Sequence, residues 1–290
     1  MEKCFSGKNA CRMNGEKQQT KLHYFGQKDT DICSQTPYGA NDNAGHYVQS
    51  DDAKLYYEIY GQGSPVLVLH GGIVGTSYEM GRLIDQLKNN HQVIVMSTRG
   101  HGRSEIGHKP LSYEQRADDA LAVLTDVTNE PAIVIGFSDG AYTAYKLASM
   151  YPSHIKKVVA IGAGENLNQL RKIVANSVED MIKADPVFMK SQMALMPEPG
   201  RLQEHWNSMP EYYNYKMIAD YKLFASIKCR VLLISGERDP NAPLATVIAA
   251  YYMIPDCQLA IISKAGHPCF IENFDAVWDN ICPFIKDENN

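Results

Sequence analysis

Six short apolar runs, separated by stretches with helical periodicity, constrain the fold of this chain more than any other feature of its 290 residues. The runs lie at 65–69, 92–96, 131–135, 157–161, 230–234 and 258–262. Each has the length of a buried strand, and the stretch between the second and third runs carries apolar residues at helical spacing: Ala117, Ala120, Leu121, Leu124 and Val127. This alternation predicts an α/β fold with a mostly parallel sheet and helices on both faces.

A predicted hairpin precedes the first run. Residues 46–48 and 53–60 are predicted strands, and the polar residues around Asp51 form the turn. The hairpin adds two antiparallel strands at the N-terminal edge, which makes an eight-stranded sheet. Parallel sheets of this kind bind ligands beyond the carboxyl ends of their strands, so polar residues that directly follow the runs are candidate site residues.

Composition divides the chain into an arm, a core and an insertion. Residues 1–45 are polar and aperiodic, which predicts a flexible N-terminal arm because few apolar side chains are available to offset the entropy of ordering. The core is predicted over 46–164 and 227–290. Residues 165–226 follow the sixth strand, lack a strand signal and contain several prolines, which predicts a lid of short helices. One amphipathic helical face is expected there, formed by Leu170, Ile173, Val174, Val178, Met181 and Ile182.

The charge and hydropathy of the chain exclude some classes of protein. The net charge of −5 argues against nucleic acid as the main partner, and no apolar run approaches the length of a membrane-spanning helix. No apolar stretch of the kind found in signal peptides follows Met1. We therefore expect a cytoplasmic monomer or homodimer that binds a small molecule. A missing leader would place it in the periplasm or outside the cell instead.

The cysteines predict neither a disulfide framework nor a metal site. There are seven, an odd number, and none stands in a C-x-x-C pair. No group of histidines has the spacing of zinc ligands. Free thiols in a reducing compartment are expected, with no metal and no cofactor.

The sequence Gly136-Phe137-Ser138-Asp139-Gly140 has the pattern of a nucleophile elbow. A predicted strand precedes it and a helical pattern follows it at 141–150. A serine in such a tight turn requires glycine neighbours, and its hydroxyl lies at the positive end of a helix. The pattern therefore makes Ser138 a candidate nucleophile.

A serine nucleophile needs a base and an orienting carboxylate, and two further loops supply candidates. Asp239 follows the seventh predicted strand, with Glu237 as a rival acid in the same loop. His267 follows the eighth strand. The resulting chain order of serine, acid and histidine is that of the α/β-hydrolases.

These motifs together resemble the α/β-hydrolase superfamily, and in particular its small lid-bearing serine hydrolases. The similarity covers His46 to the C-terminus and is carried by His70-Gly71-Gly72, by residues 99–104, by the elbow, by residues 236–239 and by Gly266-His267. Within the superfamily the chain is similar to valacyclovir-hydrolase-like esterases, enol-lactonases and meta-cleavage-product hydrolases.

The resemblance implies a role for each site residue. Ser138 would attack a carbonyl, His267 would accept and return the proton, and Asp239 would orient the imidazole. The backbone N–H groups of Gly72 and Asp139 would form the oxyanion hole, with Ile73 as the alternative to Gly72. The charged side chain of Asp139 could touch the substrate, but it is expected to point away, so that only its N–H takes part.

The resemblance also implies a substrate pocket under the lid. Its expected lining residues are Ile73, Phe137, Met189, Met193 and Trp206. The expected reaction is hydrolysis of a small to medium carboxylic ester, thioester or lactone. Hydrolysis of an amide or a carbon–carbon bond by the same triad stays open, as does a non-catalytic ligand receptor on the same scaffold.

Overall fold

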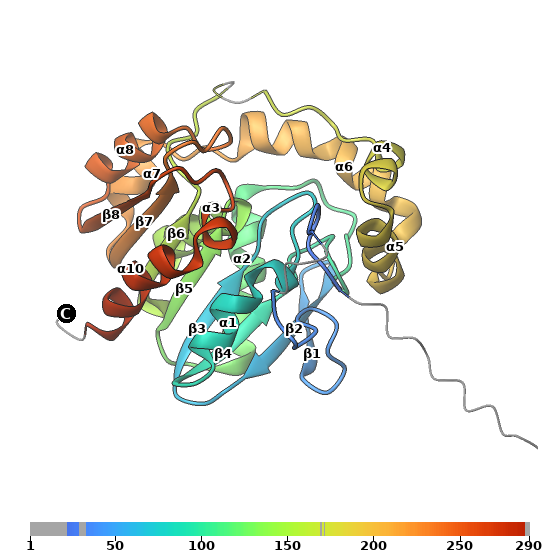
Figure 1. Ribbon diagram of the computed structural model, residues 1–290, viewed down its shortest axis with the longest axis horizontal. Coiled ribbons are helices and arrows are strands. Elements are labelled where there is room, and N and C mark those ends of the chain that lie inside the picture. The colour runs from blue at the N-terminus through green and yellow to red at the C-terminus, as the bar shows by residue number, and fades with distance from the viewer. Residues whose placement is uncertain (1–21, 29–32, 169, 171, 288–290) are drawn as a thin grey trace, which may run out of the picture.

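An eight-stranded, mostly parallel sheet forms the centre of the molecule (Figure 1). The structure is a computed structural model, and it describes residues 22–28, 33–168, 170 and 172–287. The strand order is β1-β2-β4-β3-β5-β6-β7-β8. The strands are β1 (Gly45–Ser50), β2 (Ala53–Tyr60), β3 (Ser64–Leu69), β4 (His91–Met96), β5 (Ala132–Phe137), β6 (Ile155–Ile161), β7 (Arg230–Gly236) and β8 (Cys257–Ile262). Antiparallel pairing joins β1 to β2 and β2 to β4, and all other pairs are parallel, as predicted.

Two hydrophobic clusters cover the two faces of this sheet. Strand β3 shows the division, because Val66 and Val68 belong to one cluster and Leu67 and Leu69 to the other. Helices α1 (Gly81–Leu87) and α10 (Phe274–Lys286) pack on the valine face. Helices α2 (Tyr113–Val127), α3 (Asp139–Met150) and α8 (Leu244–Met253) pack on the leucine face. The apolar runs are therefore strands buried on both sides, which is why their sequences do not alternate.

A group of short helices lies between β6 and β7 and extends beyond one end of the sheet (Figure 1). We call residues 165–226 the insertion. Its helical elements are α4 (Val178–Ala184), α5 (Pro186–Leu195), η3 (Pro199–Arg201), α6 (Leu202–Glu211), the π-helical η4 (Tyr212–Lys216) and α7 (Tyr221–Ser226). Among the described residues, no helix is long and apolar enough to cross a membrane.

The prediction of one amphipathic helical face from Leu170 to Ile182 is wrong. Helix α4 begins only at Val178, and the side chain of Val174 is 74% exposed. The side-chain amide of Asn214 accepts a hydrogen bond from the N–H of Ile173 at 2.9 Å and donates one to its carbonyl at 2.8 Å. These bonds satisfy the backbone of Ile173 without a helix, so a periodic sequence folds here as an extended segment.

The prediction of a flexible arm over 1–45 is wrong for residues 33–44. Tyr38 is 1% exposed, belongs to the valine-face cluster and donates a hydrogen bond to Asp85 at 2.7 Å. The buried carboxylate of Glu58 accepts the N–H groups of Gly39 and Asn41 at 2.9 and 2.8 Å. A polar segment is thus ordered by backbone hydrogen bonds to a core carboxylate. Residues 1–21 and 29–32 lie outside the described residues.

Candidate active site

Ser138 occupies a strained turn between β5 and α3. Its φ of 51° and ψ of −115° are unfavourable for a residue with a side chain, and its N–H donates to the carbonyl of Ile161 at 2.8 Å. A Cβ on Gly136 would overlap the backbone of Gly140, and a Cβ on Gly140 would overlap the carbonyl of Leu69. The flanking glycines of the pentapeptide are therefore required by close packing of the turn against itself and against β3.

A continuous chain of hydrogen bonds joins Ser138, His267 and Asp239. The Nε2 atom of His267 lies 2.9 Å from the Oγ of Ser138, and its Nδ1 atom lies 2.7 Å from the Oδ2 of Asp239. An imidazole that donates from Nδ1 to a carboxylate presents the lone pair of Nε2 to the serine hydroxyl. The structure therefore brings together all three predicted residues in the geometry of a base poised to accept a serine proton.

The loop after β7 distinguishes the two candidate acids. The Oδ1 atom of Asp239 accepts the N–H groups of Asn241 and Ala242 at 2.7 and 2.8 Å, which leaves Oδ2 for the histidine. Glu237 is exposed, and its carboxylate instead accepts the N–H of Lys264 at 2.7 Å. The carboxylate at the imidazole is therefore that of Asp239.

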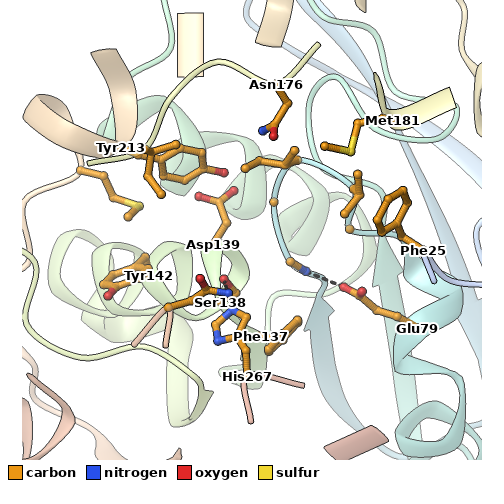
Figure 2. Close-up of a pocket in the computed structure, with 18 residues that line it drawn as sticks. Phe25, Glu79, Phe137, Ser138, Asp139, Tyr142, Asn176, Met181, Tyr213 and His267 are labelled. Atoms are coloured by element: carbon orange, nitrogen blue, oxygen red, sulfur yellow. Dashed lines mark hydrogen bonds between the residues drawn. The ribbon is translucent and has the colours of Figure 1, made fainter. Parts of the chain in front are cut away.

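Ser138 and His267 open into a pocket of about 310 Å³ (Figure 2). Of the predicted lining residues, Ile73 and Phe137 lie in its wall. The insertion contributes much of the remaining wall, through Ile173, Asn176, Met181, Tyr213 and Met217. The pocket is thus enclosed between the strand ends and the insertion.

The prediction that Met189, Met193 and Trp206 line this pocket is wrong. Met189 and Trp206 are each 2% exposed and line a separate, smaller cavity behind the loop of Ile73 and Val74. Met193 is partly buried against the leucine-face cluster. These side chains hold α5 and α6 against the core.

Several lining residues have no signal in the sequence that marks them as such. Tyr213 and Met217 stand in a stretch rich in tyrosine and methionine, where nothing distinguishes residues that line a pocket from residues that pack the insertion onto the core. Tyr142 and Asn241 lie one helical turn from Ser138 and two residues beyond Asp239, where a search for neighbours of the site could have found them. Phe25 comes from the polar N-terminal region, where nothing in the pattern indicates a contact with the site.

The loop after β3 carries the predicted oxyanion donor and is held by a buried carboxylate. The N–H of Gly71 donates to Oε1 of Glu79 at 2.8 Å. Burial raises the pKa of Glu79 to about 7, although hydrogen bonds from the backbone of Gly71 and Thr76 lower it. A Cβ on Gly72 would overlap the hydroxyl of Tyr213, so a larger residue there would require the Tyr213 side chain or the loop to shift.

The side chain of Asp139, predicted either to touch the substrate or to point away from it, borders the pocket. The side chain is 2% exposed and lies in the wall of the pocket, between Ser138 and Tyr213 in Figure 2. Its carboxylate lies 3.6 Å from the guanidinium of Arg116 and 3.4 Å from the hydroxyl of Tyr212. Burial raises the pKa of Asp139, and the charge of Arg116 lowers it. The carboxyl group of Asp139 and the guanidinium of Arg116 therefore lie buried together next to Ser138.

No group of histidine, cysteine, aspartate and glutamate suited to a metal ion occurs among the described residues. The cysteines in this part of the chain, at positions 33, 229, 257, 269 and 282, are free thiols.

Comparison with known proteins gives consistent matches. The model of the family described as the alpha/beta hydrolase fold matches residues 65–195. A protein named as a carbamate hydrolase, RutD of Azorhizobium caulinodans, is 27% identical over 243 residues, which cover 76% of this chain and 91% of that protein. The serine hydrolase BPHL of Homo sapiens is 26% identical over 210 residues, which cover 68% of this chain and 70% of that protein.

A solved structure shows the same fold at lower identity. The meta-cleavage product hydrolase from Pseudomonas fluorescens IP01 has a TM-score of 0.72 and 21% sequence identity, with coverage of 86% of this chain and 100% of that one.

Proposed function

We propose that the chain is a serine hydrolase of the α/β-hydrolase superfamily that cleaves a small to medium carboxylic ester, thioester or lactone. The observation that carries this proposal is the hydrogen-bonded chain from Asp239 through His267 to Ser138 at the floor of an enclosed pocket. A serine hydroxyl bonded to an oriented imidazole is an activated nucleophile.

The proposed reaction has two steps. Ser138 attacks the carbonyl carbon while His267 takes its proton, and the imidazolium returns that proton to the leaving alcohol or thiol. Water then attacks the acyl-enzyme with His267 again as the base. Asp239 steadies the imidazolium in both steps. The backbone N–H groups of Gly72 and Asp139 are the proposed donors to the oxyanion.

The pocket supports a substrate of modest size. A volume of about 310 Å³ lies at the lower end of the range of small-molecule sites. Most of the side chains around it are apolar, among them Ile73, Phe137 and Met181, and the polar side chains of Asn176 and Asn241 are also in the wall. We propose that the insertion acts as the lid of this pocket.

Cleavage of other bonds competes with ester cleavage in this proposal. One relative is named as a carbamate hydrolase and one structural neighbour as a meta-cleavage product hydrolase, and neither name refers to a carboxylic ester. The same three residues would serve a carbamate, an amide or a carbon–carbon bond. A non-catalytic receptor is disfavoured because binding a ligand does not require a serine that is hydrogen-bonded to an oriented imidazole.

Hydrolysis of p-nitrophenyl esters from acetate to octanoate tests the proposal. Turnover by the parent that is lost in Ser138→Ala and kept in Ser153→Ala, a control on an exposed serine, would support it. Equal turnover by the parent and Ser138→Ala would contradict the nucleophile. No turnover by a folded parent, together with hydrolysis of a carbamate or amide, would move the proposal to that bond.

A further inference from the structure

We infer that Phe25, from a segment that precedes the catalytic core, is a specificity-determining residue of the pocket, and that Asp185 of the insertion holds it in place. The inference rests on the proposed function, because it concerns which substrates the Ser138 pocket accepts. We call residues 22–28 the N-terminal clasp. It precedes the hairpin strand β1 by more than a dozen residues along the chain.

Phe25 reaches the pocket from outside the hydrolase core. Its side chain is part of the wall, at the end occupied by Met181 and Glu79 and away from Tyr142 (Figure 2). The ring of Phe25 packs edge-on against the ring of Phe188 in α5, with centroids 5.4 Å apart and planes at 83°. An aromatic ring braced in this way is a firm apolar boundary.

A single carboxylate, that of Asp185, joins the N-terminal clasp to the insertion. The Nε2 atom of His23 lies 3.1 Å from each of its oxygens, and the N–H of Gly26 donates to Oδ2 at 2.9 Å. The same carboxylate caps α5 by accepting the N–H of Phe188 at 3.0 Å. Phe25 therefore lies between His23 and Gly26 in the chain, and both of these residues bond to the carboxylate of Asp185.

The environment of the Asp185 carboxylate favours strong hydrogen bonds to the N-terminal clasp. The side chain of Asp185 is only 12% exposed and that of His23 only 16%. Burial raises the pKa of Asp185, but hydrogen bonds from the backbone of Phe188 and Gly26 and from His23 lower it overall. An ionised carboxylate with three donors forms stronger hydrogen bonds than a neutral acceptor would.

The wall formed by Phe25 determines which substrate groups fit at this end of the pocket. The rings and methylenes of Phe25, Met181 and Val74 accept an apolar group. The ring of Phe25 also limits its length, because a longer alkyl group would have to displace it. The inferred preference is for a short apolar group, on either the acyl or the alcohol side of the ester.

Two substrate series test the inference with Phe25→Ala, Phe25→Leu and the parent. One series varies the acyl group of p-nitrophenyl esters, and the other varies the alcohol of alkyl acetates. In one of the two series, Phe25→Ala should raise the ratio of kcat/KM for the longest to the shortest member by roughly tenfold, the discrimination that a methylene or two produces in an apolar pocket. Phe25→Leu should lie between Ala and the parent.

Asp185 variants separate specificity from helix capping. The N–H groups of Gly26 and Phe188 donate to different oxygens of Asp185, so Asp185→Asn keeps an acceptor for one of them, whereas Asp185→Ala removes both acceptors. Asp185→Ala should shift the same ratio in the same direction as Phe25→Ala, and Asp185→Asn should shift it less. A lower thermal midpoint in Asp185→Ala with the parental ratio would mean that Asp185 only caps α5, and would overturn the anchoring role.

A control variant and two different negative results distinguish failure of this inference from failure of the proposed function. Tyr252→Ala removes an aromatic side chain that is 80% exposed on α8, and it should keep the parental ratio. Ser138-dependent turnover with an unchanged ratio in Phe25→Ala for both series would overturn the inference alone. Turnover that does not depend on Ser138 would overturn the proposed function and the inference with it.

Discussion

The two walls of the catalytic pocket differ in what holds them in place. The inner wall consists of the strand-end loops that carry Gly72, Ser138, Asp239 and His267. Backbone groups fix most of it, as in the bond from the N–H of Ser138 to Ile161 in β6, and the buried carboxylate of Glu79 holds the loop of Gly72. The outer wall consists of the insertion and the N-terminal clasp. Single side chains such as those of Asn214 and Asp185 fix it.

This difference separates the two parts of the proposed function. The inner wall depends on the register of the sheet, which cannot shift without exposing a buried strand face. The outer wall depends on a few side-chain contacts that can change one at a time. Substitutions in the inner wall should therefore affect the chemical step, and substitutions in the outer wall should affect which substrate is accepted.

The largest expected effect is that of Ser138→Ala on the inner wall. Loss of the nucleophile should lower kcat by about 10⁴-fold to 10⁶-fold, as triad losses do elsewhere. The thermal midpoint should stay close to that of the parent because only one hydroxyl is removed. Steady-state kinetics and thermal unfolding on the same preparation measure both, and a variant that is inactive because it is unfolded would not support the role.

Gly72→Ala should have the next largest effect, because it joins the two walls. The added methyl would overlap the hydroxyl of Tyr213, and we expect the loop of Gly72 to shift because Tyr213 is itself buried. We expect kcat to fall about 10²-fold to 10³-fold, the loss seen when one oxyanion donor is removed. Adding Tyr213→Phe makes room for the methyl and should restore at least a tenfold part of the loss. Parental kcat in Gly72→Ala would contradict the proposed place of the oxyanion.

Glu79 should matter through the loop that it holds. Glu79→Ala removes the acceptor for the N–H of Gly71, and we expect about a tenfold lower kcat with KM little changed. Glu79→Gln retains an acceptor oxygen and should keep most of the activity. A role for Glu79 in packing alone would instead lower the thermal midpoint in both variants and leave kcat unaltered.

The pH dependence of stability gives a smaller effect with a definite sign. The pKa of Glu79 rises from 4.5 to about 7 on folding, so the folded state binds more protons than the unfolded state between these values. Stability from this group is present below pH 4.5 and is lost as the pH rises through 7. Relative to Glu79→Gln, the parent should lose at most about 3 kcal/mol of unfolding free energy between pH 5 and pH 8. Denaturant unfolding at the two pH values measures this difference, and a relative gain by the parent would contradict the assignment.

The smallest expected effect on activity comes from Met189→Ala. Met189 is buried outside the pocket, so its loss should destabilise the fold by about 2–5 kcal/mol while the preference along the ester series stays parental. Met181→Ala is the matched variant in the pocket wall and should change that preference. A changed preference in Met189→Ala would show that the two cavities communicate.

The inner wall was predictable from sequence because it depends on local patterns. The strands lie within two residues of the apolar runs, with the elbow and the loops of Asp239 and His267 at their ends. In a parallel sheet, the loop that directly follows each strand lies at the carboxyl edge of the sheet, so residues that follow the apolar runs can be placed there from the sequence. The local pattern does not separate Asp239 from Glu237 in the same loop; the family resemblance favoured Asp239, and it is the carboxylate of Asp239 that lies at the imidazole.

The outer wall was not predictable because its contacts join distant segments. Phe25 meets Phe188 across more than 160 residues, and neither has a periodicity that indicates the other. The segment around Tyr38 is polar in composition and is ordered by a carboxylate, Glu58, that stands in a strand. A prediction of order from composition rests on the number of apolar residues. It cannot include backbone hydrogen bonds to a distant side chain, such as those from Gly39 and Asn41 to Glu58.

The central claim is that Ser138 is an activated nucleophile, and labelling with a fluorophosphonate tests it most directly. Peptide mass spectrometry after labelling should find one adduct, on Ser138, in the parent and in Ser153→Ala. The adduct should be absent from Ser138→Ala and greatly slowed in His267→Ala. A folded parent that remains unlabelled, or an adduct on another residue that persists in Ser138→Ala, would contradict the account.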